Sequence, residues 1–297
     1  MSVNSEIEHL IEKGKNFLVQ DNLLDAIECY DKVLSKHPED LKANIGKGDA
    51  LSSLNRYNEA LECYDRVLHI DPKNFDALYA KGVVLHFLKQ YSDAIICYDK
   101  ALEIYPDNVD ALTGKGTALA NCGKYDEAIE CCNKALGIEQ NNVEGLSIIS
   151  YSLNHLSKYQ KAIECCNRVL KIKPDNMLTL TDKGFALANC GKYNEAIECY
   201  DLVLKNNSTA ITALINKGYA LINLDKYDEA IECCNRVLNI IPVNVCALTT
   251  KGYALNNFGK YDEAIECCNK ALTIESDHTY ALPTKEHALN KQSFILP

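Results

Sequence analysis

Residues 123–136 read GKYDEAIECCNKAL, and the same fourteen residues return at 259–272. Two close variants, GKYNEAIECYDLVL at 191–204 and DKYDEAIECCNRVL at 225–238, lie between them. The four segments begin at multiples of 34 residues from one another. Self-similarity at such a fixed period indicates a repeat protein, in which each repeat is one supersecondary unit.

The period can be followed in both directions from this segment without an insertion or a deletion. Within 126–138 the apolar and small residues have the spacing of an α-helix with one buried stripe, and no segment alternates like a half-buried strand. Each unit is therefore predicted to hold helix A at about unit positions 2–14 and helix B at about 18–30. A ninth, partial unit begins at Thr279. Counted from Ile7, the eight full units are 7–40, 41–74, 75–108, 109–142, 143–176, 177–210, 211–244 and 245–278.

Small residues recur at two positions of the unit. Position 8 is glycine in seven units and Ser150 in the fifth, and position 20 is alanine in all eight. Two antiparallel helices approach closely only where neither carries a bulky side chain, so we expect position 8 to pack against position 20. Proline, whose ring cannot continue a helical hydrogen-bond ladder, follows helix B at position 32 in five units. These prolines are Pro38, Pro72, Pro106, Pro174 and Pro242.

This pattern of small residues at positions 8 and 20, with proline at 32, resembles the tetratricopeptide repeat. The resemblance implies an all-α fold: a right-handed superhelical solenoid of eight tandem helix-turn-helix repeats, with a C-terminal capping helix over 279–292. Residues 1–297 would then form a single solenoid domain. The chain departs from the family at position 7, where lysine replaces leucine, and at position 4, where leucine mostly replaces tryptophan. Lysine can lay its methylenes along the packed face and keep its ammonium in water, so we expect the fold to tolerate this change.

Composition and charge limit the classes of partner. The chain is 47% hydrophobic and 24% charged, with a formal net charge of −10. Nucleic acid and anionic membranes reward positive charge, so we expect neither as a partner. The amino terminus lacks the continuous apolar core of a secretory signal, and no stretch approaches the ~18 apolar residues that span a bilayer. We therefore expect a cytoplasmic protein, while delivery into a host cell stays open.

The fifteen cysteines follow the repeat. Eight occupy position 23 and four occupy position 24, and equivalent positions in stacked units should lie about 10 Å apart, beyond the reach of a disulfide. No zinc-like spacing occurs, and no two histidines stand at i, i+4. We therefore expect reduced thiols that pack as small apolar groups in a reducing compartment. The chain also lacks a phosphate loop and a nucleophile elbow, so we expect no catalysis, no cofactor and no metal.

The resemblance implies that a partner binds in a concave groove lined by helix A positions 2, 5, 6, 9, 12 and 13. The first five units place six acids and two lysines there, whereas the last three carry one acid, Asp182. Aromatic residues occupy position 9 of units five to eight, and polar residues occupy positions 12 and 13. The candidate partner-binding residues are Tyr151, Asn154, His155, Phe185, Asn189, Tyr219, Asn223, Tyr253, Asn256 and Asn257.

This chemistry suits an extended protein or peptide segment of neutral to basic character. Asparagine can donate to and accept from a peptide backbone of any sequence, and tyrosine is a common interface anchor. The basic clamp with which some family members hold a chaperone's terminal carboxylate is lacking, so that partner is not expected. Three alternatives stay open. Repeat duplication could have copied these residues without a role, the chain could be a structural or self-associating scaffold that uses its convex face and helix edges, or it could be a regulatory array for a separate catalytic chain.

Overall fold

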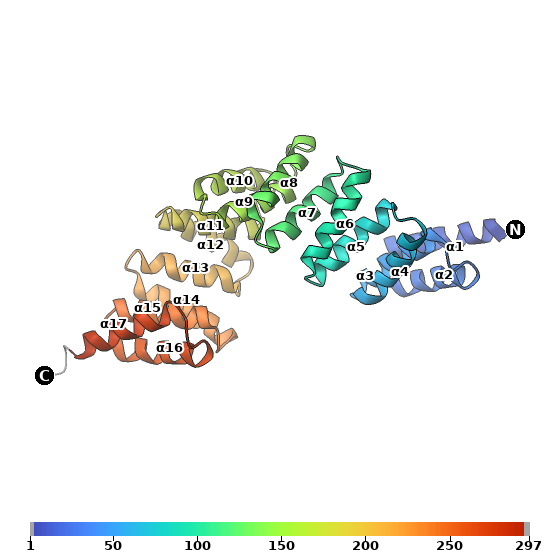
Figure 1. Cartoon of the computed structure of the whole chain (residues 1–297). Coiled ribbons are helices and arrows are strands. Elements are labelled where there is room, and N and C mark those ends of the chain that lie inside the picture. The colour runs from blue at the N-terminus through green and yellow to red at the C-terminus, as the bar shows by residue number, and fades with distance from the viewer. Residues whose placement is uncertain (1–2, 294–297) are drawn as a thin grey trace. The chain divides into compact units, whose positions relative to one another are not determined.

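The computed structural model of the chain describes residues 3–293, and over that range it consists of α-helices joined by short turns, with no strand (Figure 1). Consecutive helices pack against one another along the chain, which confirms the predicted all-α repeat fold. By its internal contacts the chain divides into two compact units, Met1–Ser152 (the first unit) and Leu153–Pro297 (the second unit). No described helix is long and apolar enough to cross a membrane.

The first unit contains the helices up to and including most of α9. They are α1 (Val3–Val19), α2 (Leu23–Lys36), α3 (Leu41–Ser53), α4 (Tyr57–Ile70), α5 (Phe75–Phe87), α6 (Tyr91–Ile104), α7 (Val109–Asn121), α8 (Tyr125–Ile138) and α9 (Val143–His155). The second unit continues with α10 (Tyr159–Ile172), α11 (Met177–Asn189), α12 (Tyr193–Asn206), α13 (Ile211–Ile222), α14 (Tyr227–Ile240), α15 (Val245–Asn257), α16 (Tyr261–Ile274) and α17 (Ala281–Ser293). From α3 to α16, odd-numbered helices are helix A and even-numbered ones helix B, and each begins about one residue before its predicted start. The predicted capping helix is α17.

An asparagine or aspartate caps the first turn of most A helices. The Asn108 side chain, for example, accepts a hydrogen bond from the Ala111 backbone N–H at 2.8 Å, which satisfies one of the free donors of the first helical turn. Equivalent caps precede α3, α5, α9, α11 and α15. The exception is α13, where Ala210 provides no side-chain cap.

In every 34-residue repeat, helix A is followed at position 15 by a residue with left-handed backbone conformation. The Gly123 N–H bonds to the Ala120 carbonyl and the Lys124 N–H to the Leu119 carbonyl, which is the Schellman pattern of helix termination. Glycine adopts this conformation without strain, with φ of +76° at Gly123. In five repeats a residue other than glycine occupies position 15, for example Lys89 with φ of +60° and Ser157 with φ of +56°. All eight repeats therefore share the turn geometry, although the residue type at position 15 differs between them.

The glycine at position 8 meets the side chain at position 24 of helix B rather than the alanine side chain that we expected. A methyl group on Gly116 would lie 2.4 Å from the Cys132 sulfur, and one on Gly14 would lie 2.7 Å from the Tyr30 ring. The position-20 alanines are fully buried beside them, and they approach some of these glycines through their backbone carbonyls. Close packing of helices A and B thus depends on the residue at position 24.

Neighbouring repeats meet at two kinds of junction. Where position 24 is tyrosine, its ring extends beneath position 6 of the next repeat, and in two junctions that residue is glycine: Gly46 over Tyr30 and Gly114 over Tyr98. Where position 24 is cysteine, position 6 of the next repeat is never glycine or alanine, as with Ile148 after Cys132. The two positions share one space, so at the first three tyrosine junctions the ring is matched by a small residue; Asn216 after Tyr200 is the exception.

At the tyrosine junctions the lysine at position 7 forms an ion pair with the preceding repeat. Lys115 Nζ lies 2.5 Å from Asp99 of the preceding repeat, and three further pairs have the same spacing: Lys47–Asp31, Lys81–Asp65 and Lys217–Asp201. These lysine side chains are 19–25% exposed. Their methylenes pack as predicted, but the ammonium groups bind carboxylates across the junction. At the cysteine junctions asparagine replaces this aspartate.

Candidate functional site

Large aromatic side chains stand exposed at position 9 of successive A helices. In the second unit Phe185 of α11 is 40% exposed, Tyr219 of α13 51% and Tyr253 of α15 44%. Tyr151 of α9, in the first unit, is 38% exposed. Exposed aromatic groups of this size at equivalent positions form a regular apolar series that the core does not use.

Tyrosines at position 17, the first residue of helix B, contact two of these aromatic residues. The Tyr159 and Phe185 rings meet edge to face with centroids 6.2 Å apart, and Tyr125 and Tyr151 do so at 6.4 Å. Such edge-to-face pairs fix ring orientation. Position 17 was not among the predicted site residues, although tyrosine recurs there in seven of the eight repeats. That recurrence is the signal that could have identified it.

The asparagines at position 13 form a second series beside the aromatic residues. Asn189 Nδ2 donates to the Phe185 backbone carbonyl at 2.9 Å, and Asn223 makes the same bond to Tyr219 at 2.9 Å. Asn257 repeats it with Tyr253 at 3.1 Å. Each bond uses one of the two amide N–H groups, which leaves one N–H and the carbonyl oxygen of an exposed side chain. The exposed His155 occupies the same position at the end of α9.

The two predicted asparagines at position 12 lie inside the helix packing. Asn154 is 6% exposed, and its Nδ2 donates to the Asp182 backbone carbonyl of α11 at 3.1 Å. Asn256 is 5% exposed, and its amide lies 3.0 Å from Nδ1 of His287 in α17. Both side chains link one helix A to the next, so they offer a partner little surface. Of the ten predicted residues, these two are separated from the exposed series.

We define the helix-A face of the second unit as the surface of α11, α13 and α15 that carries positions 2, 6, 9 and 13. Asp182 is its one acid. Burial raises the pKa of the Asp182 carboxyl to about 6. Lysine and arginine are absent from these positions of the three helices. The face is otherwise neutral.

In the first unit the corresponding surface carries the predicted acids. Asp49 accepts a hydrogen bond from the Tyr64 hydroxyl at 2.8 Å, and burial together with nearby Asp76 raises the pKa of its carboxyl. Burial and the Asp110 charge raise the pKa of the Glu144 carboxyl in the same way. The acids of neighbouring repeats thus lie near enough to influence one another in two pairs, Asp49 with Asp76 and Asp110 with Glu144.

The cysteines are packing residues. Eleven are buried, Cys165 is partly buried, and Cys122, Cys190 and Cys246 are exposed. Burial raises the pKa of the Cys234 thiol to about 12 and that of Cys268 to about 11, so both stay protonated and unreactive at neutral pH. Within the described range, no group of three or more histidine, cysteine or acidic side chains is arranged to hold a metal ion.

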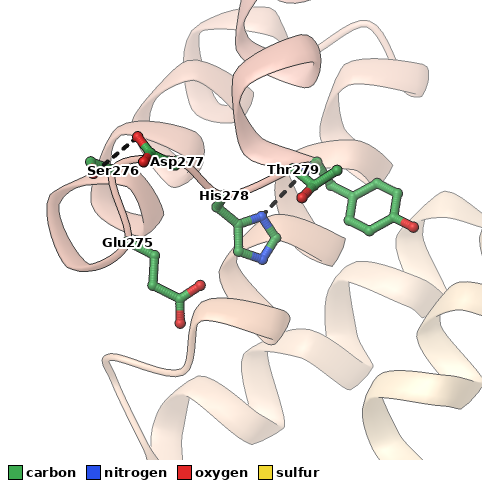
Figure 2. Close-up of a pocket in the computed structure, with 6 residues that line it drawn as sticks. Glu275, Ser276, Asp277, His278 and Thr279 are labelled. Carbon is green, nitrogen blue, oxygen red and sulfur yellow. Dashed lines mark hydrogen bonds between the residues drawn. The ribbon is translucent and has the colours of Figure 1, made fainter.

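Figure 2 shows a pocket of about 500 Å³ in the turn between α16 and α17, lined by residues 275–280. Its polar groups are engaged locally. The Ser276 hydroxyl donates to the Asp277 carboxylate at 3.2 Å, and the Tyr280 backbone N–H donates to His278 Nδ1 at 3.3 Å (Figure 2). These bonds stabilise the turn, and no nucleophile and base converge there. The exposed aromatic series therefore remains the candidate site.

Comparison with known families gives matches along most of the chain. Models described as tetratricopeptide repeat match residues 75–108, 109–142, 144–176, 179–209, 211–244 and 245–278, and a model described as TPR repeat matches 48–88. Four of the matches, 75–108, 109–142, 211–244 and 245–278, coincide with units of the 34-residue register. No curated protein matches the sequence significantly.

Solved structures with the same fold are distant in sequence. A chain in the crystal structure of the APC/C hetero-tetramer Cut9–Hcn1 aligns with a TM-score of 0.70 at 19% identity, over 94% of this chain and 55% of that one. A tetratricopeptide repeat protein from Parabacteroides merdae aligns with a TM-score of 0.59 at 15% identity, over 96% of this chain and 100% of its own length. Pseudomonas aeruginosa PilF aligns with a TM-score of 0.61 at 19% identity, over 70% of this chain and 94% of its own length. The chain thus spans about half of the Cut9–Hcn1 chain, and these likenesses concern the fold.

Proposed function

The chain belongs to the tetratricopeptide repeat family, whose repeats indicate a protein–protein interaction scaffold, and we propose that it binds an extended segment of a partner protein on the helix-A face of its second unit. The family's fold is generally an adaptor without catalytic activity, and we propose binding without a chemical step for this member as well.

One observation carries the proposal: each exposed aromatic residue is followed, one helical turn later, by an asparagine with free hydrogen-bonding groups. The pairs are Phe185–Asn189, Tyr219–Asn223 and Tyr253–Asn257. The aromatic ring offers a large, rigid surface at low entropic cost, and the amide can bond to any peptide backbone. Three such pairs on three helices suit an extended segment better than a small molecule.

The charges of the chain favour a neutral or basic segment. The helix-A face of the second unit has one carboxylate and no cation, and the corresponding surface of the first unit is acidic. A segment rich in aspartate and glutamate would be repelled by both. For the same reason we do not propose the terminal carboxylate of a chaperone as the ligand.

The test begins with peptides selected by the intact chain from a random dodecapeptide phage library. Affinity for a selected peptide is then measured by fluorescence anisotropy for the wild type and for Tyr219→Ala/Tyr253→Ala. Because buried aromatic anchors often contribute ~2 kcal/mol each, we expect the double variant to bind at least about tenfold more weakly. Equal affinities would contradict the proposal.

A matched control removes two exposed apolar side chains from helix B of the same unit. Leu202 of α12 is 50% exposed and Ile240 of α14 is 46% exposed, so Leu202→Ala/Ile240→Ala removes comparable apolar surface elsewhere. We expect this control to bind like the wild type. If the chain is instead a self-associating scaffold that uses helix B, the control will change its sedimentation, and Tyr219→Ala/Tyr253→Ala will leave both sedimentation and peptide binding unchanged.

A further inference from the structure

Asp182 lies on α11 between two exposed apolar side chains. Leu178 precedes it by four residues and Phe185 follows it by three, which places all three on one face of the helix. Leu178 is 68% exposed and Phe185 40%, whereas Asp182 is only partly exposed. The Asp182 side chain is thus less exposed than its two apolar neighbours, one of which, Phe185, belongs to the aromatic series.

The Asp182 carboxylate has no hydrogen bond or ion pair in the described part of the chain. Its backbone carbonyl accepts from Asn154 of α9, and the one side chain known to lie within electrostatic range of its carboxylate, Tyr200 of α12, carries no positive charge. Lys183, its neighbour in sequence, lies near the Cys199 thiol instead. A partly desolvated charge without a partner is costly, and packing alone does not account for it.

The Tyr200 hydroxyl is a second polar group without a partner at this place. It is fully buried near Asp182 and Asn216, and it makes no hydrogen bond of ordinary geometry. In the first unit, Tyr64 occupies the same repeat position and donates its hydroxyl hydrogen to Asp49 at 2.8 Å. The Tyr30 hydroxyl, at the same repeat position, also lacks a hydrogen bond, so it is the Asp182 carboxylate that points to a ligand, and the Tyr200 hydroxyl shows only that no neighbour satisfies that carboxylate. The Asp182 site therefore contains two polar groups whose bonding is incomplete.

We propose that Asp182 binds a lysine or arginine side chain of the partner segment, whose aliphatic stem lies against Leu178 and whose cationic group lies beside the Phe185 ring. An ammonium or guanidinium group would supply the counterion that the carboxylate lacks, and arginine could do so with two hydrogen bonds. A phenyl ring attracts a cation within about 6 Å of its centroid. The inference rests on the proposed function and adds to it the one residue type that the segment must contain.

The test repeats the dodecapeptide selection in parallel on the intact wild-type chain, on Asp182→Asn and on Glu232→Gln, which removes an exposed carboxylate from helix B of the same unit. We expect peptides selected by the wild type and by Glu232→Gln to carry lysine or arginine at one fixed position. Asp182→Asn should select peptides without that preference. A wild-type selected peptide should bind Asp182→Asn about tenfold more weakly.

Replacing the basic residue of the selected peptide by methionine completes a double-mutant cycle. The wild type should lose about tenfold in affinity, and Asp182→Asn should lose almost nothing further. A basic preference that survives in Asp182→Asn, or is lacking in the wild-type selection, would overturn the inference while the proposed function stands. Selection of the same peptides by Tyr219→Ala/Tyr253→Ala would overturn both.

Discussion

The residue at position 15 shows how a single backbone conformation can be common to all repeats while its side chain changes. The φ angle is positive in every repeat, but glycine occupies the position in only three. A methyl group added to Gly123 would meet no atom within 4 Å, so any cost of adding it comes from the backbone conformation. This separates backbone strain from packing.

Gly123→Ala should lower the free energy of unfolding by about 1 kcal/mol, because the left-handed conformation costs a residue with a Cβ atom that much or more. Lys89→Gly should raise it by a similar amount, since it removes the same strain in the native state. Urea unfolding followed by circular dichroism measures both. Lys89→Ala is the control, and a rise in stability for it as large as for Lys89→Gly would mean that the lysine side chain, and not its backbone, is unfavourable.

Asp182 gives a pH dependence whose direction follows from its environment. Its pKa is raised from 3.8 to about 6 by burial, so between these values the folded chain holds the proton more tightly than the unfolded chain. The contribution of Asp182 to stability therefore falls as pH rises from about 4 to 6 and stays unfavourable above that range. Asp182→Asn should be more stable than the wild type at pH 7.5 and should lose that advantage at pH 4. Urea midpoints at the two pH values measure this, and a variant less stable at pH 7.5 would contradict it.

At the scale of packed helices, the side chain at position 24 of one repeat and the residue at position 6 of the next occupy a shared space. Sequence periodicity predicted the helices and their order because the buried stripe repeats with them. It did not predict which residue meets the position-8 glycine, since that contact depends on how far the side chain of helix B reaches across. It also missed the burial of Asn154 and Asn256, because the next helix A, and not their own, covers them.

Gly114→Ala should destabilise the chain by roughly 1–3 kcal/mol, because the added methyl group would lie 2.8 Å from the Tyr98 ring. In a Tyr98→Cys background the same change should cost much less, since the ring no longer occupies the space. Gly137→Ala is the control: nothing lies within 4 Å of its added methyl group, and it should be neutral or stabilising. Equal costs of Gly114→Ala in both backgrounds would show that the two positions do not share a space.

Along the full chain the cysteines provide an independent check of the register. Position 23 lies in the packed interior of helix B, whereas Cys122, Cys190 and Cys246 lie at exposed positions. Brief treatment of the native protein with iodoacetamide should modify these three and spare the buried thiols, whose pKa values burial raises. Peptide mass spectrometry identifies the modified sites, and unfolding in urea should expose all fifteen. Rapid native modification of Cys131 or Cys234 would contradict the packing described here.

The fold could be predicted from the sequence because each structural signal, such as the small residues at positions 8 and 20, recurs in eight repeats. The sequence was not enough for the site, because duplication copies functional and idle residues alike. Exposure shows only which of these residues a partner could reach: Phe185, Tyr219 and Tyr253 are exposed, whereas Asn154 and Asn256 are part of the packing. The isolation of Asp182 needed the neighbouring helices to be in place before it could be recognised.

Hydroxyl-radical footprinting of the intact chain, with and without a saturating selected peptide, tests the proposed binding face most directly. Aromatic side chains react readily, and so, more slowly, do exposed leucine and isoleucine. Leu202 of α12 and Ile240 of α14, at 50% and 46% exposed, serve as internal controls on helix B of the same unit. Bound peptide should protect Phe185, Tyr219 and Tyr253 and leave the two controls unchanged. Undiminished modification of Tyr219 and Tyr253 in the bound state would contradict binding on the helix-A face of the second unit.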